Sequence, residues 1–242
     1  MITTVSIYEM YRIINEEHRN PHSVLGMHEV LNGGKEMLSV RVFAPGAKVV
    51  TVIEKKGRKK EFEAQLIHDD GFFEAVITSR KKWFPYTLRI EYNDGNIYET
   101  ADKYSFRPTV SEYDRYLYGA GTHYEIYKKL GAHLCNVDGT DGVSFAVWAP
   151  NAKSISIVGS FNYWDGRTAQ MRMLGNSGIW ELFVPEAAEF DKYKFRIKDR
   201  NGKTVDKSDP FGFYSEIRPM KASIIYDLGV YHWKDSEWLE KR

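Results

Sequence analysis

The sequence predicts an all-β protein made of two tandem immunoglobulin-like β-sandwiches, with a short N-terminal helix and a linker segment. Three observations predict this fold. One pattern of residues occurs twice along the 242-residue chain. Within each copy, short runs of apolar and alternating residues are typical of strands. Asp-Gly and Asn-Gly pairs, which adopt the positive φ angles of tight hairpins, lie between several of these runs.

The repeat is carried by five pairs of segments. Phe43–Lys48 recurs as Trp148–Lys153, an offset of 105 residues (from 43 to 148). The other pairs keep the same order, at offsets of 105 or 107 residues: Leu25–His28 with Leu130–His133, Gly71–Glu74 with Gly178–Glu181, Tyr86–Ile90 with Tyr193–Ile197, and Asp102–Phe106 with Asp209–Phe213. Matches in order with so little drift indicate a duplicated domain.

The strands of each copy follow from local pattern. Val40–Phe43 and Ser144–Trp148 both stop at an Ala-Pro pair, where proline cannot donate to a sheet. Ser154–Val158 alternates with period two, which places Ile155 and Ile157 on one face. Asn93–Gly95 and Arg200–Gly202 are the expected hairpin turns.

Two segments outside these strands have helical features. Ser6–His18 carries apolar side chains at helical spacing, and Ser6 is the expected N-cap. These apolar residues are Ile7, Met10, Tyr11 and Ile14. Ser111–Leu130 contains Gly119 and Gly121 and is expected to be a linker with a short helical turn.

The chain is therefore divided into three parts. Residues 1–112 form the N-terminal helix and the first sandwich. Residues 113–228 form the linker and the second sandwich, and residues 229–242 form a tail that carries Trp233 and Trp238.

Composition excludes several classes of partner. The formal net charge is +1, too small to attract nucleic acid or an acidic membrane surface. No apolar run is long enough to span a membrane, and the N-terminus lacks the pattern of a secretion signal. With a single cysteine the chain cannot form an internal disulfide, which fits the cytoplasm. We expect a cytoplasmic protein without nucleic-acid or membrane partners.

The most specific local feature is the segment Gly159–Asp165, which follows a predicted strand and contains Asn162, Tyr163 and Trp164. An indole can pack flat on the apolar face of a sugar ring while polar neighbours bond to its hydroxyls. Spacing alone leaves open whether Trp164 is such a platform or a core residue.

Comparison of the two copies favours a surface role for Trp164. The equivalent stretch of the first copy, Glu54–Lys60, contains no aromatic residue, so the fold itself does not require one there. Two other aromatic positions are kept in both copies and are expected in the cores. These are Phe43 with Trp148 and Phe73 with Trp180.

Lys194 lies in a predicted strand on the face opposite Tyr193 and Phe195. Its ammonium group is able to donate to sugar hydroxyls, but the pattern alone fits an ordinary exposed lysine. No catalytic residue, metal site or cofactor is predicted. The seven histidines share no metal-ligand spacing, and neither a phosphate-binding loop nor a Gly-x-Ser-x-Gly motif occurs.

The chain resembles the N-terminal region of bacterial glycogen branching enzymes over essentially its whole length. Asn20–His28 is similar to the start of that family's first module, and Val143–Ala152 with Gly159–Arg167 is similar to its second, a family-48 carbohydrate-binding module. Lys207–Pro219 and Tyr231–Asp235 look like the segment leading into the catalytic barrel.

This resemblance implies recognition of α-1,4-glucan or glycogen, with Trp164 and Lys194 at sugar-contacting positions and Asn162 and Tyr163 beside them. It implies the catalytic barrel of the parent enzyme as a second partner. Two features of glucan-binding relatives are missing: the hairpin Asp199–Thr204 has no stacking ring, and the late asparagine is replaced around Lys221–Ser223.

The barrel pattern and its catalytic signatures are absent from this sequence, so no enzymatic activity is expected of the chain alone. The resemblance implies that branching of glucan in glycogen biosynthesis belongs to the parent enzyme. The alternative is a structural or interaction module that braces the barrel, with Trp233 and Trp238 docking on it and little sugar binding of its own.

Overall fold

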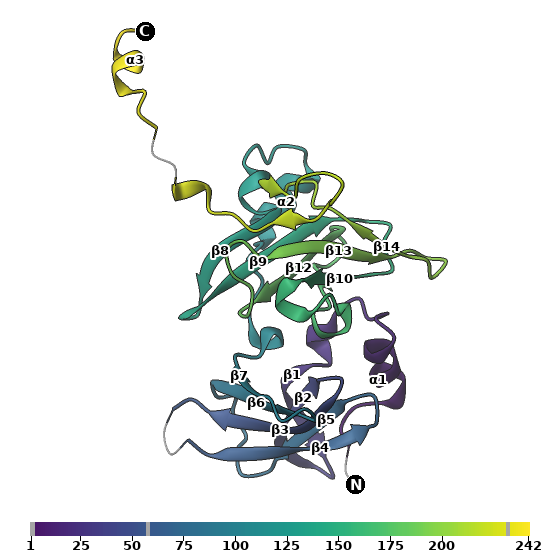
Figure 1. Cartoon of the computed structure of the whole chain (residues 1–242). Helices are drawn as coiled ribbons and strands as arrows, with labels where there is room; N and C mark the ends of the chain where they lie inside the picture. Colours follow the sequence, from purple (N-terminus) through teal and green to yellow (C-terminus); the bar gives the residue numbers. More distant parts are fainter. Residues whose placement is uncertain (1–2, 57–58, 231–232) are drawn as a thin grey trace.

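The computed structural model describes residues 3–56, 59–230 and 233–242, and its sheets confirm the predicted all-β fold with a short N-terminal helix. Figure 1 shows two β-rich bodies stacked on each other along the chain. We call the body built from β1–β7 the first module and the body built from β8–β16 the second module.

The first module contains α1 (Ile7–Ile14), η1 (Pro21–Ser23), β1 (Gly26–Asn32), β2 (Lys35–Phe43), β3 (Ala47–Glu54), β4 (Glu61–His68), β5 (Phe72–Ile77), β6 (Tyr86–Tyr92), β7 (Ile97–Thr100) and η2 (Lys103–Ser105). Its strands form one antiparallel sheet in the order β1-β2-β5-β4-β3-β6-β7. The first half of β4 pairs with β3 and the second half with β5, so β4 joins the two halves of the sandwich.

The second module follows α2 (Glu112–Gly119) and η3 (Ile126–Lys128). Its elements are β8 (Gly131–Val137), β9 (Thr140–Trp148), β10 (Ser154–Gly159), η4 (Ser160–Asn162), η5 (Gly166–Thr168), β11 (Arg172–Met173), β12 (Ile179–Val184), β13 (Lys192–Lys198), β14 (Thr204–Lys207), β15 (Tyr214–Ser215) and β16 (Ser223–Ile224). One sheet has the order β11-β12-β9-β8, and the other has the order β10-β13-β16-β15 with β14 also on β13.

The hairpin turns lie where the sequence predicts them. The turn at Asn93–Gly95 joins β6 to β7, and the turn at Arg200–Gly202 joins β13 to β14. Gly95 and Gly202 have φ angles of 87° and 84°, which a residue with a side chain rarely adopts.

Helix α1 is shorter than predicted and buries a different face. Ser6 caps it as expected, since its side chain accepts from the amide of Glu9, but the helix ends at Ile14. Met10 and Ile13 are buried against Phe43 and Phe72, while Ile7 and Tyr11 are exposed. The buried face of α1 therefore contains Ile13 in place of the predicted Ile7 and Tyr11, because Ile13 packs in one cluster with Phe43 and Phe72.

The segment after the first module is more helical than predicted. It forms α2, a regular helix of eight residues, in place of a short turn. Ser111 and Asp114 form a capping box, in which each side chain bonds to the other residue's backbone amide. Gly119 is the last residue of this helix and Gly121 follows it, so the two glycines end the helix without preventing it.

The prediction that Trp148 is a core residue is wrong. Phe43, Phe73 and Trp180 are buried, but Trp148 is 49% exposed. In the first module Met10 and Ile13 of α1 pack with Phe43 in one buried cluster, whereas in the second module the ring of Trp148 has an edge contact with Tyr118 of α2, at a centroid distance of 6.0 Å. The two copies differ here because α1 buries Phe43, while the contact with α2 leaves Trp148 half exposed.

The duplication extends to a buried hydrogen bond in each module. The hydroxyl of Tyr86 donates to Asp102 at 2.5 Å, and the hydroxyl of Tyr193 donates to Asp209 at 2.5 Å. All four side chains are buried. Burial raises the pKa of both aspartates and of both tyrosines. In each pair the tyrosine lies on the first strand of a hairpin, β6 or β13, and the aspartate follows the second strand, β7 or β14. The hydrogen bond therefore links the hairpin to the segment after it and pairs both buried polar groups.

The two modules are joined by the turn that follows α1. The carboxylate of Glu17 lies 2.9 Å from the ammonium groups of both Lys153 and Lys198, which belong to the second module. The hydrogen bonds from these two lysines lower the pKa of Glu17, and the bond from Lys198 has the larger effect. The amide of Gln170 adds a buried contact, because its Nε2 donates to the carbonyl of Ile13 at 2.8 Å.

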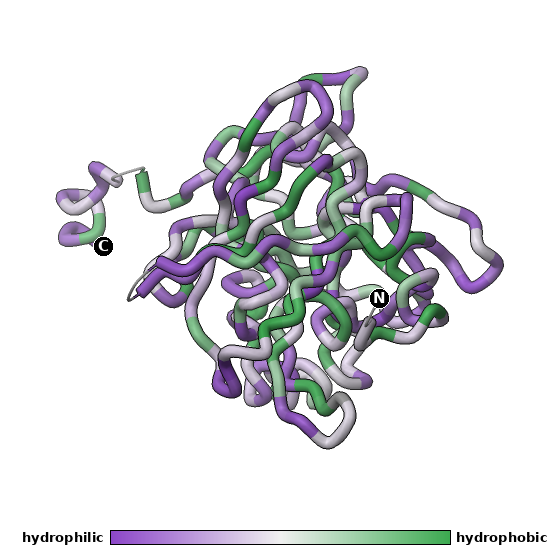
Figure 2. Tube along the Cα trace, turned by 90° about the horizontal axis from the view of Figure 1, so that it is seen from below, coloured by the Kyte–Doolittle hydropathy of each residue, from purple (hydrophilic) through white to green (hydrophobic). Residues whose placement is uncertain are grey.

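The C-terminal part of the chain stands apart from both modules. η6 (Leu228–Val230) leads toward α3 (Ser236–Glu240), which extends away from the sheets in Figure 1 and Figure 2. Trp233 and Trp238 are exposed. Tyr231 and His232, part of the predicted segment leading to a barrel, lie outside the described residues.

We predict that Tyr193→Phe destabilises the second module, because it leaves the buried Asp209 carboxylate without the phenol that donates to it. Loss of one partner of a buried hydrogen bond costs about 1–3 kcal/mol. Urea unfolding measures the change, and Tyr124→Phe is the matched control because Tyr124 is 88% exposed. Equal stability of the two variants would show that the Tyr193–Asp209 bond contributes nothing.

We predict that the free energy of unfolding falls as the pH falls through about 6.5, the ordinary pKa of histidine. Burial lowers the pKa of His18, His22 and His28 in the folded protein. The unfolded chain therefore takes up protons that the folded chain excludes. His22 is the strongest case, since neither of its buried ring nitrogens has a hydrogen-bond partner among the residues that the structure describes.

His22→Phe should weaken this pH dependence, because phenylalanine keeps a ring beside Tyr104 but has no proton to bind. Denaturant unfolding of wild type and variant between about pH 7 and about pH 5 tests the prediction. A pH dependence unchanged by the substitution would contradict it.

Candidate functional site

The candidate site is the loop that follows β10, with the strand β13 beside it. β10 ends at Gly159, where a Cβ atom would lie 2.5 Å from the carbonyl oxygen of Lys192 and 2.6 Å from the ring of Phe161. Only glycine fits this close approach. The chain then turns through η4 and returns, so that the amide of Trp164 donates to the carbonyl of Gly159 at 2.9 Å.

Two successive aromatic residues of this loop have left-handed backbone conformations. The φ angles are 54° for Tyr163 and 62° for Trp164. Bulky residues rarely adopt such angles, and each instance costs about 1–3 kcal/mol. The result is that both rings project from the loop, with Tyr163 85% exposed and Trp164 39% exposed. Strain of this kind at exposed rings is typical of functional sites.

Asn162 holds the loop closed from within. Its side-chain nitrogen donates to the carbonyls of Ile157 at 2.9 Å and Asp165 at 3.0 Å, and its side-chain oxygen accepts from the amide of Gly159 at 2.9 Å. Both amide hydrogens are therefore used by the loop's own backbone. In this arrangement Asn162 positions the two rings and has no hydrogen free for a ligand.

Two further pairs fix the ends of the loop. Arg167 donates to both oxygens of Asp165, at 2.7 Å for the shortest bond. Burial alone would raise the pKa of Asp165. The hydrogen bonds from Arg167 outweigh this effect, so the pKa of Asp165 is lowered. The hydroxyl of Ser160 donates to Asp191 at 2.6 Å.

The first module supports the loop from below. A Cβ atom on Gly166 would collide with the hydroxyl of Ser156 and would lie 2.7 Å from Oε1 of Glu16. The Ser156 hydroxyl donates to this same carboxylate at 2.9 Å. Glu16 therefore fills the space beneath the loop, and sequence reasoning missed it because it precedes Ser156 by 140 residues.

Lys194 completes the site from the neighbouring strand. It lies on the face of β13 opposite the buried Tyr193 and Phe195, as predicted. Its Nζ lies 5.9 Å from the centroid of the Trp164 ring, a distance at which an ammonium group is attracted to an indole. An apolar ring and a hydrogen-bond donor thus meet at one place on the surface.

Of the four residues predicted for the site, Tyr163, Trp164 and Lys194 come together on the surface, while Asn162 lies inside the loop. The described residues of the first module contain no counterpart, since β3 ends at Glu54 and β4 already begins at Glu61. Gly57 and Arg58 of that hairpin lie outside the described residues.

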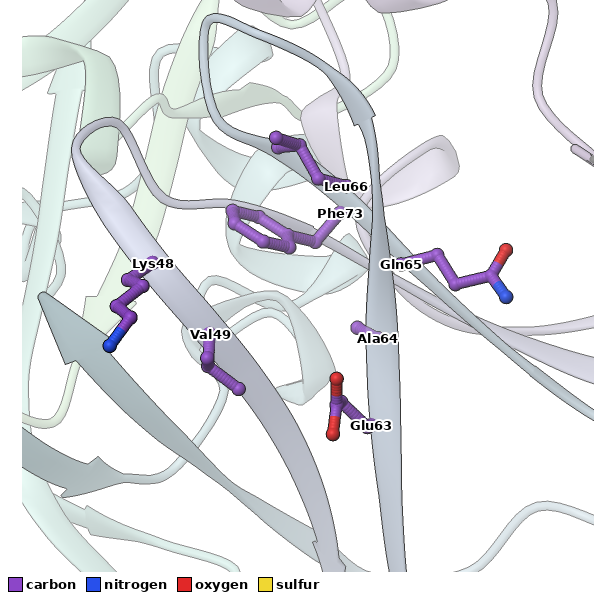
Figure 3. Close-up of a pocket in the computed structure, with 7 residues that line it drawn as sticks. All are labelled: Lys48, Val49, Glu63, Ala64, Gln65, Leu66 and Phe73. Atoms are coloured by element: carbon purple, nitrogen blue, oxygen red, sulfur yellow. The ribbon is translucent and has the colours of Figure 1, made fainter.

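A hollow of about 490 Å³ lies elsewhere, between β3 and β4 of the first module. It opens where β4 leaves β3 to pair with β5, and Figure 3 shows Leu66 and Phe73 between the strands. Its lining consists of Lys48, Val49, Glu63, Ala64, Gln65, Leu66 and Phe73. Phe73 is only 1% exposed, so this hollow offers no ring on which a sugar could stack.

Within the described ranges, no group of three or more histidine, cysteine, aspartate or glutamate side chains is placed to hold a metal ion. None of the helices in the part of the chain that the structure describes has the length and apolar character needed to cross a membrane.

Comparison with known proteins agrees with the two-module organisation. Residues 6–104 match the family model of the alpha-1,4-glucan branching enzyme GlgB, N-terminal domain, and residues 129–212 match carbohydrate-binding module 48 (isoamylase N-terminal domain). A pullulanase from Anoxybacillus sp. LM18-11 superposes with a TM-score of 0.37 at 14% identity, over 86% of this chain and 28% of that chain, a likeness too low to support an argument.

The curated relatives extend this likeness over nearly the whole chain. The 1,4-alpha-glucan branching enzyme GlgB of Thermosynechococcus vestitus is 45% identical over 99% of this chain, that of Trichodesmium erythraeum is 45% identical over 99%, and that of Myxococcus xanthus is 42% identical over 97%. The chain spans about a third of their length, 31%, 30% and 31% respectively. It therefore belongs to the 1,4-alpha-glucan branching enzyme GlgB family, of which it is the N-terminal region with a carbohydrate-binding module of family 48.

Proposed function

We propose that this chain binds α-1,4-glucan, such as glycogen, through Tyr163, Trp164 and Lys194, and positions it for the branching reaction of a parent enzyme in the cytoplasm. The observation that carries this proposal is the pair of left-handed residues that holds Trp164 outward beside Lys194. No requirement of the fold explains this strain, because the first module folds without such a loop.

The chemistry of the site suits a pyranose. The indole of Trp164 offers an apolar face for the C–H groups of one sugar unit. The ammonium group of Lys194 and the hydroxyl of Tyr163 are then able to bond to hydroxyl groups at the edge of that unit. With one stacking ring and a few hydrogen bonds, we expect a binding free energy of about 4–6 kcal/mol, or a Kd between about millimolar and tens of micromolar.

The division of the chain into residues 1–112, 113–228 and 229–242 is part of this proposal. The first boundary, after residue 112, falls one residue inside α2, whose N-cap is Ser111. A cut before Ser111 would leave the helix and its capping box whole. We further propose that the catalytic barrel of the parent enzyme is the second partner of this region.

A surface other than the sugar site favours such a protein contact. The rings of Tyr113 and Tyr116 are stacked at 6.5 Å and are 67% and 70% exposed. Trp148, 49% exposed, is also on the surface and lies against Tyr118 of the same helix. Clusters of exposed rings mark protein interfaces, so α2 is the candidate docking face for the barrel.

We predict that Trp164→Ala lowers the affinity for glycogen and maltoheptaose by at least about tenfold, the equivalent of about 1.4 kcal/mol, because the stacking face is lost. Trp148→Ala is the matched control, since it removes another exposed tryptophan away from the loop. Retardation in glycogen-containing native gels and calorimetric titration measure the effect. Equal retardation of wild type and Trp164→Ala would contradict the proposed function.

We predict that Asn162→Ala also weakens binding, by loosening the loop that presents Tyr163 and Trp164. The variant loses three hydrogen bonds, so NMR signals of the loop should change even without ligand. If affinity falls while the ligand-free loop signals stay unchanged, Asn162 contacts the sugar directly and the positioning role is wrong.

A further inference from the structure

A second group of exposed rings lies near the candidate site on the same module. It consists of Phe190 in the turn before β13, Tyr214 on β15 and Tyr226 after β16, and we call it the aromatic cluster. The ring of Tyr226 meets that of Phe190 at a centroid distance of 6.1 Å and that of Tyr214 at 5.5 Å. Phe190 is 61% exposed and Tyr214 is 51% exposed, so the cluster presents aromatic faces to solvent.

The backbone holds Phe190 in the same kind of strained conformation as the rings of the candidate site. Its φ angle is 69°, which is unfavourable for a bulky residue. Its amide donates to the carbonyl of Ile225 at 2.8 Å, which fixes the turn on β16. In the part of the chain that the structure describes, every aromatic residue with a positive φ belongs to the candidate site or to this cluster: Tyr163, Trp164 and Phe190.

The turn that carries Phe190 is bonded to the loop that carries Trp164. Asp191, the residue after Phe190, accepts from the hydroxyl of Ser160 at 2.6 Å. The same hydroxyl accepts from the amide of Lys192 at 3.0 Å. Ser160 begins η4, so the loop and the turn are held side by side before any ligand binds.

The register of the sheet places the cluster on the face that carries Lys194. Lys192 of β13 is directly opposite Ile224 of β16, which is directly opposite Tyr214 of β15. Residues in such a row share one face, and alternation along β13 adds Lys194 to it. Because neighbouring strands lie about 5 Å apart, Tyr214 is about 10 Å across the sheet from Lys192. A short glucan is long enough to cover this span.

Charged groups lie along the same path. Nζ of Lys192 is 2.8 Å from the carboxylate of Glu216, and the lysine side chain is half exposed. A pyranose has an apolar face and an edge of hydroxyl groups, so it needs rings and hydrogen-bonding groups in alternation. The row from Lys194 through Lys192 to Tyr214 offers both kinds of group.

We propose that the glucan site extends across β16 onto the aromatic cluster: a chain stacked on Trp164 passes Lys194 and Lys192 and packs further glucose units on Tyr214 and Phe190. This inference rests on the proposed function and deepens it, because it makes a long linear glucan the preferred ligand. Each added ring contact contributes to affinity only when the chain is long enough to reach it.

The test is an NMR titration of the full chain with two probes, maltose and maltoheptaose, followed through the backbone amide signals. We expect Tyr214→Ala and Phe190→Ala each to weaken maltoheptaose binding by about three- to tenfold and to leave maltose binding within about twofold of wild type. Tyr214→Phe keeps the ring and should retain both affinities. Tyr124→Ala, the control, removes a tyrosine that is 88% exposed on the connection before β8 and should change neither affinity.

Each outcome decides between the claims. If Trp164→Ala binds both probes as wild type does, the proposed function fails and the extension fails with it. If Trp164→Ala weakens both probes while Tyr214→Ala and Phe190→Ala match wild type, the function stands and the extension is overturned, which leaves the cluster as a surface for a protein partner. If Tyr214→Ala weakens both probes equally, the cluster only supports the loop, which also overturns the extension. Thermal unfolding of each variant checks that it is folded.

Discussion

The site depends on one contact, the docking of the Glu16–Glu17 turn on the second module. Glu17 lies between Lys153 and Lys198, and the hydroxyl of Ser156 donates to the carboxylate of Glu16. These charged and polar groups would each be unpaired if the modules separated, so the two sandwiches behave as a single support. Alternation along β13 places Lys198 on the same face as Lys194, and the docking therefore occurs on the sheet face that also carries Lys194 of the candidate site.

A rigid support matters because the loop above it is strained. Two consecutive left-handed aromatic residues are unfavourable by themselves, and a loop free to relax would turn Tyr163 and Trp164 away from their outward positions. The backbone bonds of Asn162 hold the loop from within, and Glu16 beneath Gly166 limits its movement from outside. Ordering a platform before the ligand arrives removes part of the entropic cost of binding.

Features that recur at a fixed spacing could be predicted from the sequence, and features that depend on the partner module could not. The repeat predicted the strands, the hairpins and the core position of Trp180, and alternation predicted the outward face of Lys194. The same repeat misplaced Trp148, because α1 buries Phe43 in the first copy while α2 leaves Trp148 half exposed in the second. The repeat also did not predict that the side chain of Asn162 donates to backbone carbonyls of its own loop. A sequence motif identifies the residue but not its hydrogen-bond partners.

The first module contacts the candidate site through Glu16, although it has no such loop of its own. Comparison of the two copies explains why. In that module β3 runs into β4 through a hairpin, while the second module replaces the hairpin with the loop of η4 and η5. The loop then needs packing that a single sandwich does not provide, and Glu16 of the first module supplies it beneath Gly166. In the proposed function, glucan recognition is therefore a property of the pair of modules, and a second module cut away from the first would keep Trp164 and Lys194 but lose the contact of Glu16 that supports the loop.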